Sequence, residues 1–202
     1  GPVSGTLVRD VMLQMNSLAG SIGIYSSDIQ SGGLYRVTVN NFVAGGVLFD
    51  GAGSAFGSIN GFVLHEVQLF KANTGGTSGY GLRIKDGSFP AQIDTVQVYG
   101  NPANPLAIGF DIENFHFIAS SINVDGASTI GVKLGTSVPA AVITGYKSIG
   151  ATDSVSITTT GKVVIVGHYP TGGTNAIVDA GNGAVAKTIA VANFTPIYVR
   201  GG

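Results

Sequence analysis

Short stretches of alternating apolar and polar residues recur along the chain, and they are of two kinds. The first kind opens with Gly and spans residues 46–50, 81–85, 109–113 and 131–134, with a weaker copy at 23–25. The second kind follows after a turn and centres on residues 11–13, 37–39, 67–69, 96–98 and 122–124, with a degraded copy at 146–148. Strict alternation predicts half-buried β-strands. Successive copies of the second kind lie about 24 to 30 residues apart, which is the spacing of solenoid repeats.

Two or three strands per repeat and no helical stretch predict an all-β fold, in which the chain winds as a parallel β-helix. Alternation points every second residue inward, so stacked coils place these residues in continuous columns. The Gly-opened strands align to give two apolar columns, Ile24, Val47, Leu82, Phe110 and Val132 in one and Phe49, Ile84, Ile112 and Leu134 in the other. A leucine-rich repeat would need fixed Leu and Asn positions that this chain lacks. An antiparallel sandwich would not need equal spacing between similar strands.

The repeat pattern changes near residue 150. From Thr152 onward, strands rich in Thr, Ser and Val are separated by Gly-rich turns. We therefore expect the parallel β-helix to span residues 3–150. Residues 151–202 are expected to form a small β-rich cap or trimerisation region, because a solenoid must cover its last strands. Residues 1–2, Gly-Pro, have the form of an expression-tag scar and are left out of the fold.

Composition excludes several classes of protein. Gly accounts for 32 of 202 residues, charged residues for only 10%, and the formal net charge is -1, while the mean hydropathy is +0.37. A disordered chain needs the opposite balance, and collagen or a coiled coil needs a different Gly or Glu pattern. Ten basic against eleven acidic residues leave no electrostatic footprint for nucleic acid. Because no run of eighteen apolar residues occurs, we also expect no membrane insertion.

Metal and cofactor chemistry finds little support in the chain. It contains no Cys, and its three histidines, His65, His116 and His168, share no metal-ligand spacing. No P-loop, nucleophile elbow or dinucleotide fingerprint is present. We therefore expect no metal and no cofactor. His65 aligns with Asp94 one coil later, which predicts a structural hydrogen bond that orients the imidazole.

Amides beside aromatic rings are predicted on the outer face of the second kind of strand. The central outward column contains Gln68, Gln97 and Asn123, and the column two residues further along contains Phe70 and Tyr99. Planar amides can bind pairs of sugar hydroxyls, and aromatic faces pack against the C–H patches of sugars. These five residues are predicted to bind carbohydrate. The structural alternative is that the amides only stabilise stacked coils and the rings pack against a neighbouring subunit.

Carboxylates near these faces are candidates for acid–base chemistry, since glycoside hydrolysis needs a pair of them. The candidate catalytic residues are Glu66, Asp111, Glu113 and Asp125. Glu66 and Asp125 border the amide face, whereas Asp111 and Glu113 form an i, i+2 pair on a Gly-opened strand.

Ion pairing is the alternative role for most of these carboxylates. Two outward columns alternate in sign and predict a surface salt ladder: Arg83, Asp111 and Lys133, and Asp50, Lys85 and Glu113. Cationic neighbours keep carboxylates ionised, which is the opposite of what a general acid needs. For Glu66, the alternative role is an ion pair with Arg36.

Gly-opened strands such as residues 81–85, paired strands such as residues 94–99, irregular coils, low charge and the absence of Cys together resemble a known family. The chain resembles, over roughly residues 6–150, the pectate-lyase-like right-handed parallel β-helix of bacteriophage tailspikes and tail fibres. The resemblance implies a homotrimer on the virion tail, in an extracellular setting. It also implies binding to a bacterial surface polysaccharide, which many relatives depolymerise. Exposed apolar residues such as Leu48, Phe70 and Ile149 would support the trimer.

The family's catalytic carboxylates follow no portable motif, so none is assigned from the resemblance. Three functions stay open at this point. The first is a phage receptor-binding or depolymerase tailspike fragment, which is the leading hypothesis. The second is a free-standing β-helix polysaccharide lyase or glycoside hydrolase. The third is a structural or adhesin solenoid with no ligand of its own.

Overall fold

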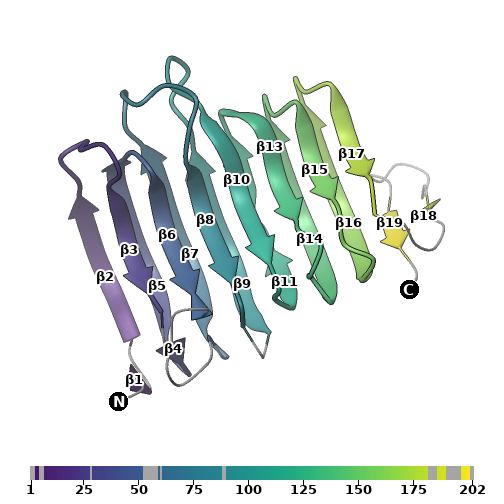
Figure 1. Ribbon diagram of the computed structural model, residues 1–202, viewed down its shortest axis with the longest axis horizontal. Helices are drawn as coiled ribbons and strands as arrows, with labels where there is room; N and C mark the ends of the chain where they lie inside the picture. The colour runs from purple at the N-terminus through teal and green to yellow at the C-terminus, as the bar shows by residue number, and fades with distance from the viewer. Residues whose placement is uncertain are drawn as a thin grey trace.

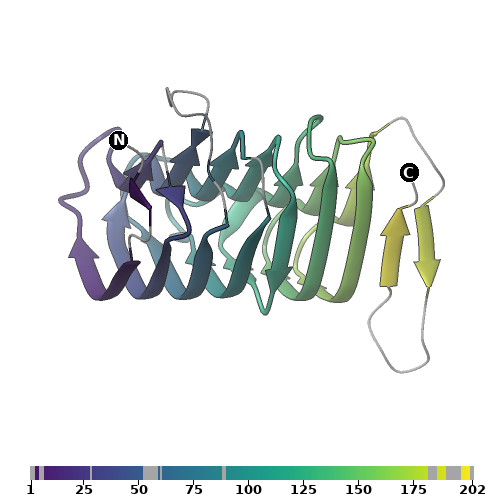
Figure 2. The ribbon, with the colours of Figure 1, turned by 90° about the horizontal axis from the view of Figure 1, so that it is seen from below.

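The chain winds into a parallel β-solenoid of about six turns, which confirms the predicted fold class. The computed structural model describes residues 3–4, 7–27, 29–51, 59, 61–87, 90–181, 186–189 and 197–200. Strands make up 68% and helix 1%, against roughly 20–25% strand in an average soluble domain. Figure 1 shows the strands side by side from one end to the other, and Figure 2 shows the coils stacked along the long axis.

Two long sheets carry most of the described strands. The ten-stranded sheet contains β2 (Leu7–Gln14), β5 (Gly33–Phe42), β7 (Val63–Lys71), β9 (Ala91–Tyr99), β11 (Phe117–Ser120), β12 (Asn123–Asp125), β14 (Ala140–Ile149), β16 (Lys162–Thr171), β18 (Ala186–Ile189) and β19 (Ile197–Arg200). The seven-stranded sheet contains β3 (Ile22–Ser26), β6 (Gly45–Asp50), β8 (Tyr80–Lys85), β10 (Leu106–Glu113), β13 (Ala127–Leu134), β15 (Asp153–Ile157) and β17 (Asn175–Asp179). A short parallel pair joins β1 (Val3–Ser4) to β4 (Ile29–Gln30).

Strand pairing confirms both apolar columns predicted for the Gly-opened strands. Ile24, Val47, Leu82, Phe110 and Val132 pair in succession, and so do Phe49, Ile84, Ile112 and Leu134. All of them except Ile24 are at most 1% exposed. Ile24 is only partly buried because β3 is the edge strand of its sheet. Full burial of one such side chain stabilises the fold by roughly 1.5–3 kcal/mol.

Parallel pairing continues past residue 150, where the sequence pattern changes. β15 pairs with β13, β16 with β14, and β17 with β15. Val155 and Ile177 extend the first apolar column, so the parallel coils reach Asp179, beyond the predicted 3–150. β19 then pairs with β16 in the antiparallel direction. The division into a solenoid and a separate cap over 151–202 remains a prediction, and residues 1–2 lie outside the described residues.

A column of inward-facing glycines explains why a Gly precedes the alternating apolar residues in five strands of the seven-stranded sheet, β3, β6, β8, β10 and β13. At Gly81, a Cβ atom would lie 2.2 Å from Cγ1 of Val98 on β9 and 2.8 Å from the carbonyl oxygen of Gly109. Gly109 in turn would meet the side chain of Val124 and the carbonyl oxygen of Gly131. These glycines do not have left-handed φ angles. They are needed because the two sheets approach too closely for any side chain.

A second column bends the ten-stranded sheet through left-handed backbone, with φ between 50° and 67°. Its members are Asp10, Arg36, Glu66, Thr95, Ser121, Gly145 and Gly167. The left-handed residue interrupts the strand alternation at each bend. On β7, for example, Leu64 and Val67 are buried while both His65 and Glu66 between them face outward. Two adjacent outward side chains are thus available at one bend.

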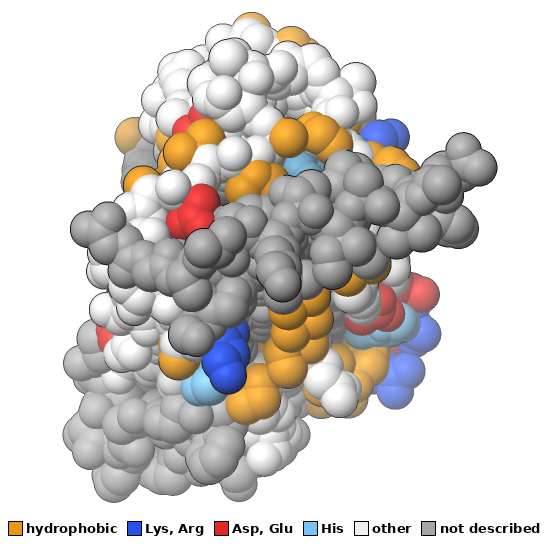
Figure 3. All heavy atoms as spheres, turned by 90° about the vertical axis from the view of Figure 1, so that its right-hand side faces the viewer, with side chains coloured by type: hydrophobic (Ala, Val, Ile, Leu, Met, Phe, Trp, Pro, Cys, Tyr) orange, Lys and Arg blue, Asp and Glu red, His pale blue; other side chains and the backbone are white. Residues whose placement is uncertain are grey.

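The predicted exposure of apolar residues is only partly matched by the structure. Leu48, Phe70 and Ile149 are half-buried. The large exposed hydrophobic side chains are Leu7, Met12, Leu18, Tyr25, Ile118, Val142 and Tyr169. Figure 3, which looks at the C-terminal end, shows groups of hydrophobic side chains on this face, with charged side chains at several places around them. Within the described residues, no helix is long and apolar enough to span a bilayer.

Candidate functional site

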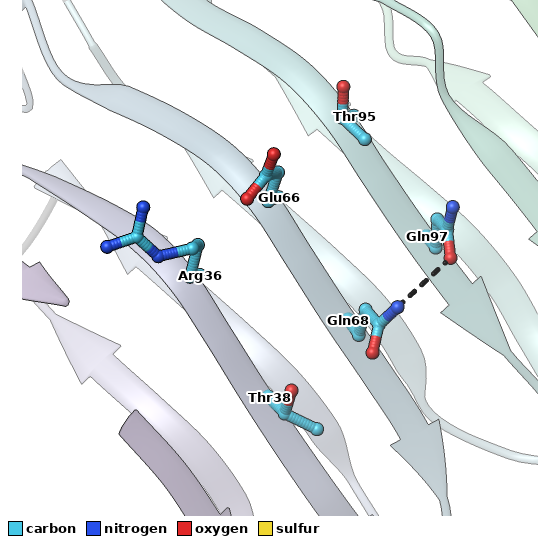
Figure 4. Close-up of a pocket in the computed structure, with 6 residues that line it drawn as sticks. All are labelled: Arg36, Thr38, Glu66, Gln68, Thr95 and Gln97. Carbon is cyan, nitrogen blue, oxygen red and sulfur yellow. Dashed lines mark hydrogen bonds between the residues drawn. The ribbon is translucent and has the colours of Figure 1, made fainter. Parts of the chain in front are cut away.

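A polar groove of about 390 Å³ crosses three consecutive coils on the ten-stranded sheet. Six side chains from β5, β7 and β9 line it: Arg36, Thr38, Glu66, Gln68, Thr95 and Gln97. Figure 4 shows them in two columns, one from the left-handed residues and one from the positions two residues further along each strand. The volume lies within the roughly 300–1,000 Å³ typical of ligand sites. The groove combines hydroxyl, amide and charged groups.

The ladder of strand pairs holds the two columns in register. Thr38 pairs with Gln68, and Gln68 pairs with Gln97. Val37, Val67 and Val96 precede these residues, face inward and are 0% exposed, which forces the polar neighbours outward. The inward valines therefore fix the position of the groove.

Charge in the groove is distributed differently from the predicted pairing of Glu66 with Arg36. Arg36 donates two hydrogen bonds to Asp10 one coil earlier, from Nε at 2.5 Å and from Nη2 at 2.9 Å. The Arg36 guanidinium holds the pKa of Asp10 below its usual range. The Glu66 carboxylate is 49% exposed, with its Oε1 3.6 Å from Nε2 of His65. Asp10 thus pairs with Arg36 and also with Arg9, whose Nε lies 3.3 Å from Oδ2 of Asp10, while Glu66 offers an acceptor to the groove.

A hydrogen-bonded chain runs beside the groove and confirms the predicted contact of His65 with Asp94. Nδ1 of His65 lies 3.0 Å from Oδ2 of Asp94, and the Ser120 hydroxyl donates to Oδ1 of Asp94 at 2.8 Å. The Ser120 hydrogen bond is the main cause that holds the pKa of Asp94 below its usual value. The Tyr35 ring packs against the imidazole, with centroids 5.9 Å apart. These hydrogen bonds hold the side chain of His65, the neighbour of Glu66 at the bend, in place.

The two glutamines form a connected ladder across the coils. Nε2 of Gln68 donates to Oε1 of Gln97 at 3.3 Å, and the hydroxyl of Tyr99 donates to the same oxygen at 2.7 Å. The predicted amide column continues in register to Asn123 on β12. Oδ1 of Asn123 is buried and has no hydrogen-bond partner among the described residues.

The predicted aromatic residues lie beside the groove and stack on each other. The rings of Phe70 and Tyr99 are nearly parallel, with centroids 4.7 Å apart and an interplanar angle of 6°. Each ring therefore covers one face of the other, and these two faces are not available to a sugar. Asp125 pairs with Tyr99 in this same column and is not among the residues that line the groove.

Asp111 and Glu113 lie on the seven-stranded sheet, and the structure does not bring them together with Glu66. Asp111 is only 4% exposed. Its carboxylate lies 2.5 Å from Nη2 of Arg83 and 3.3 Å from Nζ of Lys133. Glu113 accepts a hydrogen bond from the backbone amide of Ser137 at 3.2 Å. The predicted ladder through Asp111 is present, and its ion pairs give Asp111 a structural role.

Replacing Asp111 by Asn should therefore lower stability without affecting the groove. The substitution leaves Arg83 and Lys133 facing each other without their shared anion. Both cations keep about a third of their side-chain surface exposed, so solvent limits the loss to about 1–2 kcal/mol. Urea unfolding of Asp111→Asn measures the loss. Lys85→Ala, on the neighbouring strand of the same sheet, serves as a control that removes an outward charge.

Left-handed residues at the bend are the part of the site that the alternating pattern did not reveal. Arg36, Glu66 and Thr95 interrupt the alternation, so pattern matching places them beside the face rather than in a groove. The sequence did contain one signal for the bend: Gly145 and Gly167 occupy the same column, and Gly is the residue that most readily adopts a φ above zero.

The described residues contain no group of three or more His, Cys, Asp or Glu side chains that could hold a metal ion. Comparisons with protein-family models, with curated proteins and with solved structures find no match for this chain.

Proposed function

We propose that this solenoid binds a bacterial surface polysaccharide in the groove of the ten-stranded sheet. The observation that carries the proposal is the lining itself, two columns of polar side chains in register on three coils. Coils stack about 4.8 Å apart, so a polymer lying along the axis meets the same pair of columns at every coil. A repeating ligand suits a repeating surface.

The groove also favours an uncharged or weakly charged polymer. The lining carries one cation and one anion, because Arg36, which is hydrogen-bonded to Asp10, and Glu66 both contribute to it. Amides and hydroxyls can both donate and accept hydrogen bonds, which matches the hydroxyl groups of a glycan. A strongly anionic polymer would be repelled by Glu66, and the Arg36 guanidinium is already hydrogen-bonded to Asp10.

Binding is better supported than cleavage. Glycoside hydrolysis needs two carboxyl groups placed on either side of one bond. Among the six described residues that line the groove, Glu66 is the only carboxylate. Asp111 is ion-paired on the other sheet, so it cannot complete a pair with Glu66.

Backbone strain gives independent support. Non-Gly residues in the left-handed region pay a cost of roughly 1–2 kcal/mol each, and such strain gathers at functional sites. Arg36, Glu66 and Thr95 carry that strain and line the groove, Asp10 and Ser121 carry it in the coils on either side, and the same column holds Gly145 and Gly167 in later coils. Glycine would be less strained than any other residue at each of these left-handed positions. The side chains that line the groove are therefore present despite a conformational cost.

The wider setting that we propose is a homotrimeric bacteriophage tailspike or tail fibre, exposed on the virion tail. The parallel β-solenoid and the low charge support this setting. Light scattering of the purified chain should give the mass of a trimer. A stable monomer would count against the trimeric setting but would leave the proposed binding in the groove standing.

Glu66→Gly should change stability and binding in opposite directions. Glycine relieves the left-handed strain but adds chain entropy to the unfolded state, so the free energy of unfolding should rise by about 0.5–1 kcal/mol. Loss of the carboxylate should weaken polysaccharide binding about tenfold, which corresponds to one charged hydrogen bond. Urea unfolding measures the first effect, and binding to an array of bacterial capsular and lipopolysaccharide glycans measures the second.

Ser121→Gly is the matched control, because Ser121 occupies the same left-handed column one coil beyond the groove. It should gain similar stability and bind glycan like the original chain. If no glycan on the array binds the original chain, the proposed function is wrong. If Glu66→Gly binds as tightly as the original chain, the groove is not the binding site.

A further inference from the structure

We infer that copies of this chain pack in parallel through an apolar stripe on the ten-stranded sheet, outside the groove. This inference rests on the trimeric setting proposed above and deepens it, because it names the face through which the copies meet and their orientation. It follows from the side chains that share one outward column on the strand segments before the left-handed bend.

The stripe is one outward column that strand pairing carries through seven consecutive strands. It lies three residues before the left-handed residue of each strand, so the bend separates it from the column that contains Gln68 and Gln97. Its members, from the first strand to the last, are Leu7, Gly33, Val63, Gln92, Ile118, Val142 and Val164. Gln92 is the one member with a polar side chain.

The stripe exposes apolar surface to solvent. Leu7 is 49% exposed, Ile118 45% and Val142 38%, and these are three of the seven large hydrophobic side chains exposed among the described residues. Ile118 and Val142 also line a depression of about 370 Å³, together with the hydroxyl side chains of Ser120 and Thr144. An apolar patch with a polar rim typically marks a protein interface.

A partner for this stripe must be straight and as long as the solenoid. Seven strands at about 4.8 Å spacing extend about 30 Å, and the stripe with one outward column on either side is about 20 Å wide. The resulting area of about 600 Å² per copy reaches the lower end of what specific, stable interfaces bury. The coils stack along one straight axis (Figure 2). Another copy of the chain therefore offers an apolar stripe of equal length and equal spacing.

Gln92, the polar member of the stripe, also suits a second copy of itself. Parallel copies in register place each residue of the stripe opposite its own counterpart. An amide carries both an NH₂ donor and an oxygen acceptor, so the Gln92 side chains of neighbouring copies can hydrogen-bond to one another. A single polar residue within an apolar seam fixes the register between chains, as a buried Asn does in coiled coils.

The outward columns on either side of the stripe favour the parallel orientation. An antiparallel copy centred on Gln92 would place the Asp94 carboxylates of the two copies opposite each other, because Asp94 lies two residues beyond Gln92 on the same strand. Such like-charge contacts are unfavourable. In the parallel orientation, the column after the stripe faces the column before it in the neighbouring copy. The exposed His116 then faces Ser120 of the neighbouring copy, one coil from its Asp94.

Ile118→Lys and Val142→Lys test the stripe. The added ammonium groups would meet at the centre of a trimer, so we expect light scattering to show a threefold fall in mass, to that of the monomer. Both side chains point outward and are exposed, so the far-UV circular dichroism should stay unchanged. Met12→Lys is the control, because Met12 is 70% exposed on the other side of the bend, and it should stay assembled.

Two results would overturn the inference at this step. A trimer that persists in both lysine variants overturns the stripe and leaves the trimeric setting standing. An original chain that is monomeric overturns the stripe and the trimeric setting together. Neither result decides whether the groove binds glycan, which the glycan array measures separately.

Single cysteines test the orientation. The chain contains no Cys, so Val142→Cys introduces the only thiol. Parallel copies bring these thiols together, and we expect disulfide-linked pairs on a non-reducing gel after mild oxidation, whereas Met12→Cys should stay unlinked. In an antiparallel pair, position 142 faces Gly33 while position 92 still faces itself. Linkage of Gln92→Cys without linkage of Val142→Cys would therefore overturn the parallel orientation, and absence of linkage in both variants would overturn the interface.

Discussion

Gly81→Ala should lower the free energy of unfolding by about 3 kcal/mol or more, because the new methyl group has no space between the sheets. Its Cβ would lie 2.2 Å from Cγ1 of Val98 and 2.8 Å from the carbonyl oxygen of Gly109. One of these obstacles is backbone, so a rotamer change alone cannot relieve the overlap. Overpacking of this kind costs typically 1–3 kcal/mol and sometimes more. The urea midpoint, measured by far-UV circular dichroism, reports the loss.

Gly20→Ala separates this steric cost from the conformational cost of replacing Gly. Gly20 has φ of +76°, and no atom lies within 4 Å of the Cβ position. Alanine there should cost only about 1 kcal/mol, from the left-handed backbone. If the two variants lose equal stability, the close approach of the sheets at Gly81 is not what selects Gly.

Acid should destabilise the C-terminal coils through His168. The side chain of His168, on β16, is 3% exposed, and its ring stacks on Tyr146 with centroids 5.1 Å apart. Nε2 of His168 lies 2.7 Å from Oγ of Ser154. Burial lowers the pKa of His168 from 6.5 to about 4 and raises the pKa of Tyr146 to about 12. Both groups are therefore neutral in the core.

The sign of the effect follows from proton binding. Between pH 6.5 and 4, the unfolded chain protonates His168 while the folded chain does not, so stability is complete above pH 6.5 and falls as pH decreases. At 1.36 kcal/mol per pKa unit, the loss at pH 4 is about 3 kcal/mol relative to neutral pH.

His168→Phe should remove this part of the pH dependence, because phenylalanine keeps the stacked ring but cannot bind a proton. Urea unfolding at pH 7, 5.5 and 4 gives the slope for both chains. The difference between them isolates His168 from the carboxylates, which titrate in both. Identical slopes would show that His168 is not held neutral in the folded protein.

The register of the coils was predictable because it depends on features that the sequence shows directly. Inward residues such as Leu82 and Phe110 are apolar at every second position, and a Gly precedes them in each of the predicted Gly-opened strands. A shift of the strand pairing by one residue would turn all of these inward side chains outward. The same logic placed Gln68 and Gln97 in one outward column.

The groove was less predictable because the left-handed residues break the alternation on which that prediction rests. Glu66 is predicted beside the amide face, but the bend that brings it into the groove with Gln68 comes from its left-handed backbone φ angle, which the alternation does not show. The partner of Arg36 also depends on side-chain geometry, and it is Asp10 rather than Glu66. For the same reason the sequence could not show that Asp111 is buried between its two cations.

A crystal structure of the chain with a bound fragment of a polysaccharide selected on the array tests the central claim most directly. The account predicts sugar density against Gln68 and Gln97 on the ten-stranded sheet, with the glycan running across successive coils. Density on the seven-stranded sheet, or at a site that Glu66, Gln68 and Gln97 do not contact, would contradict it.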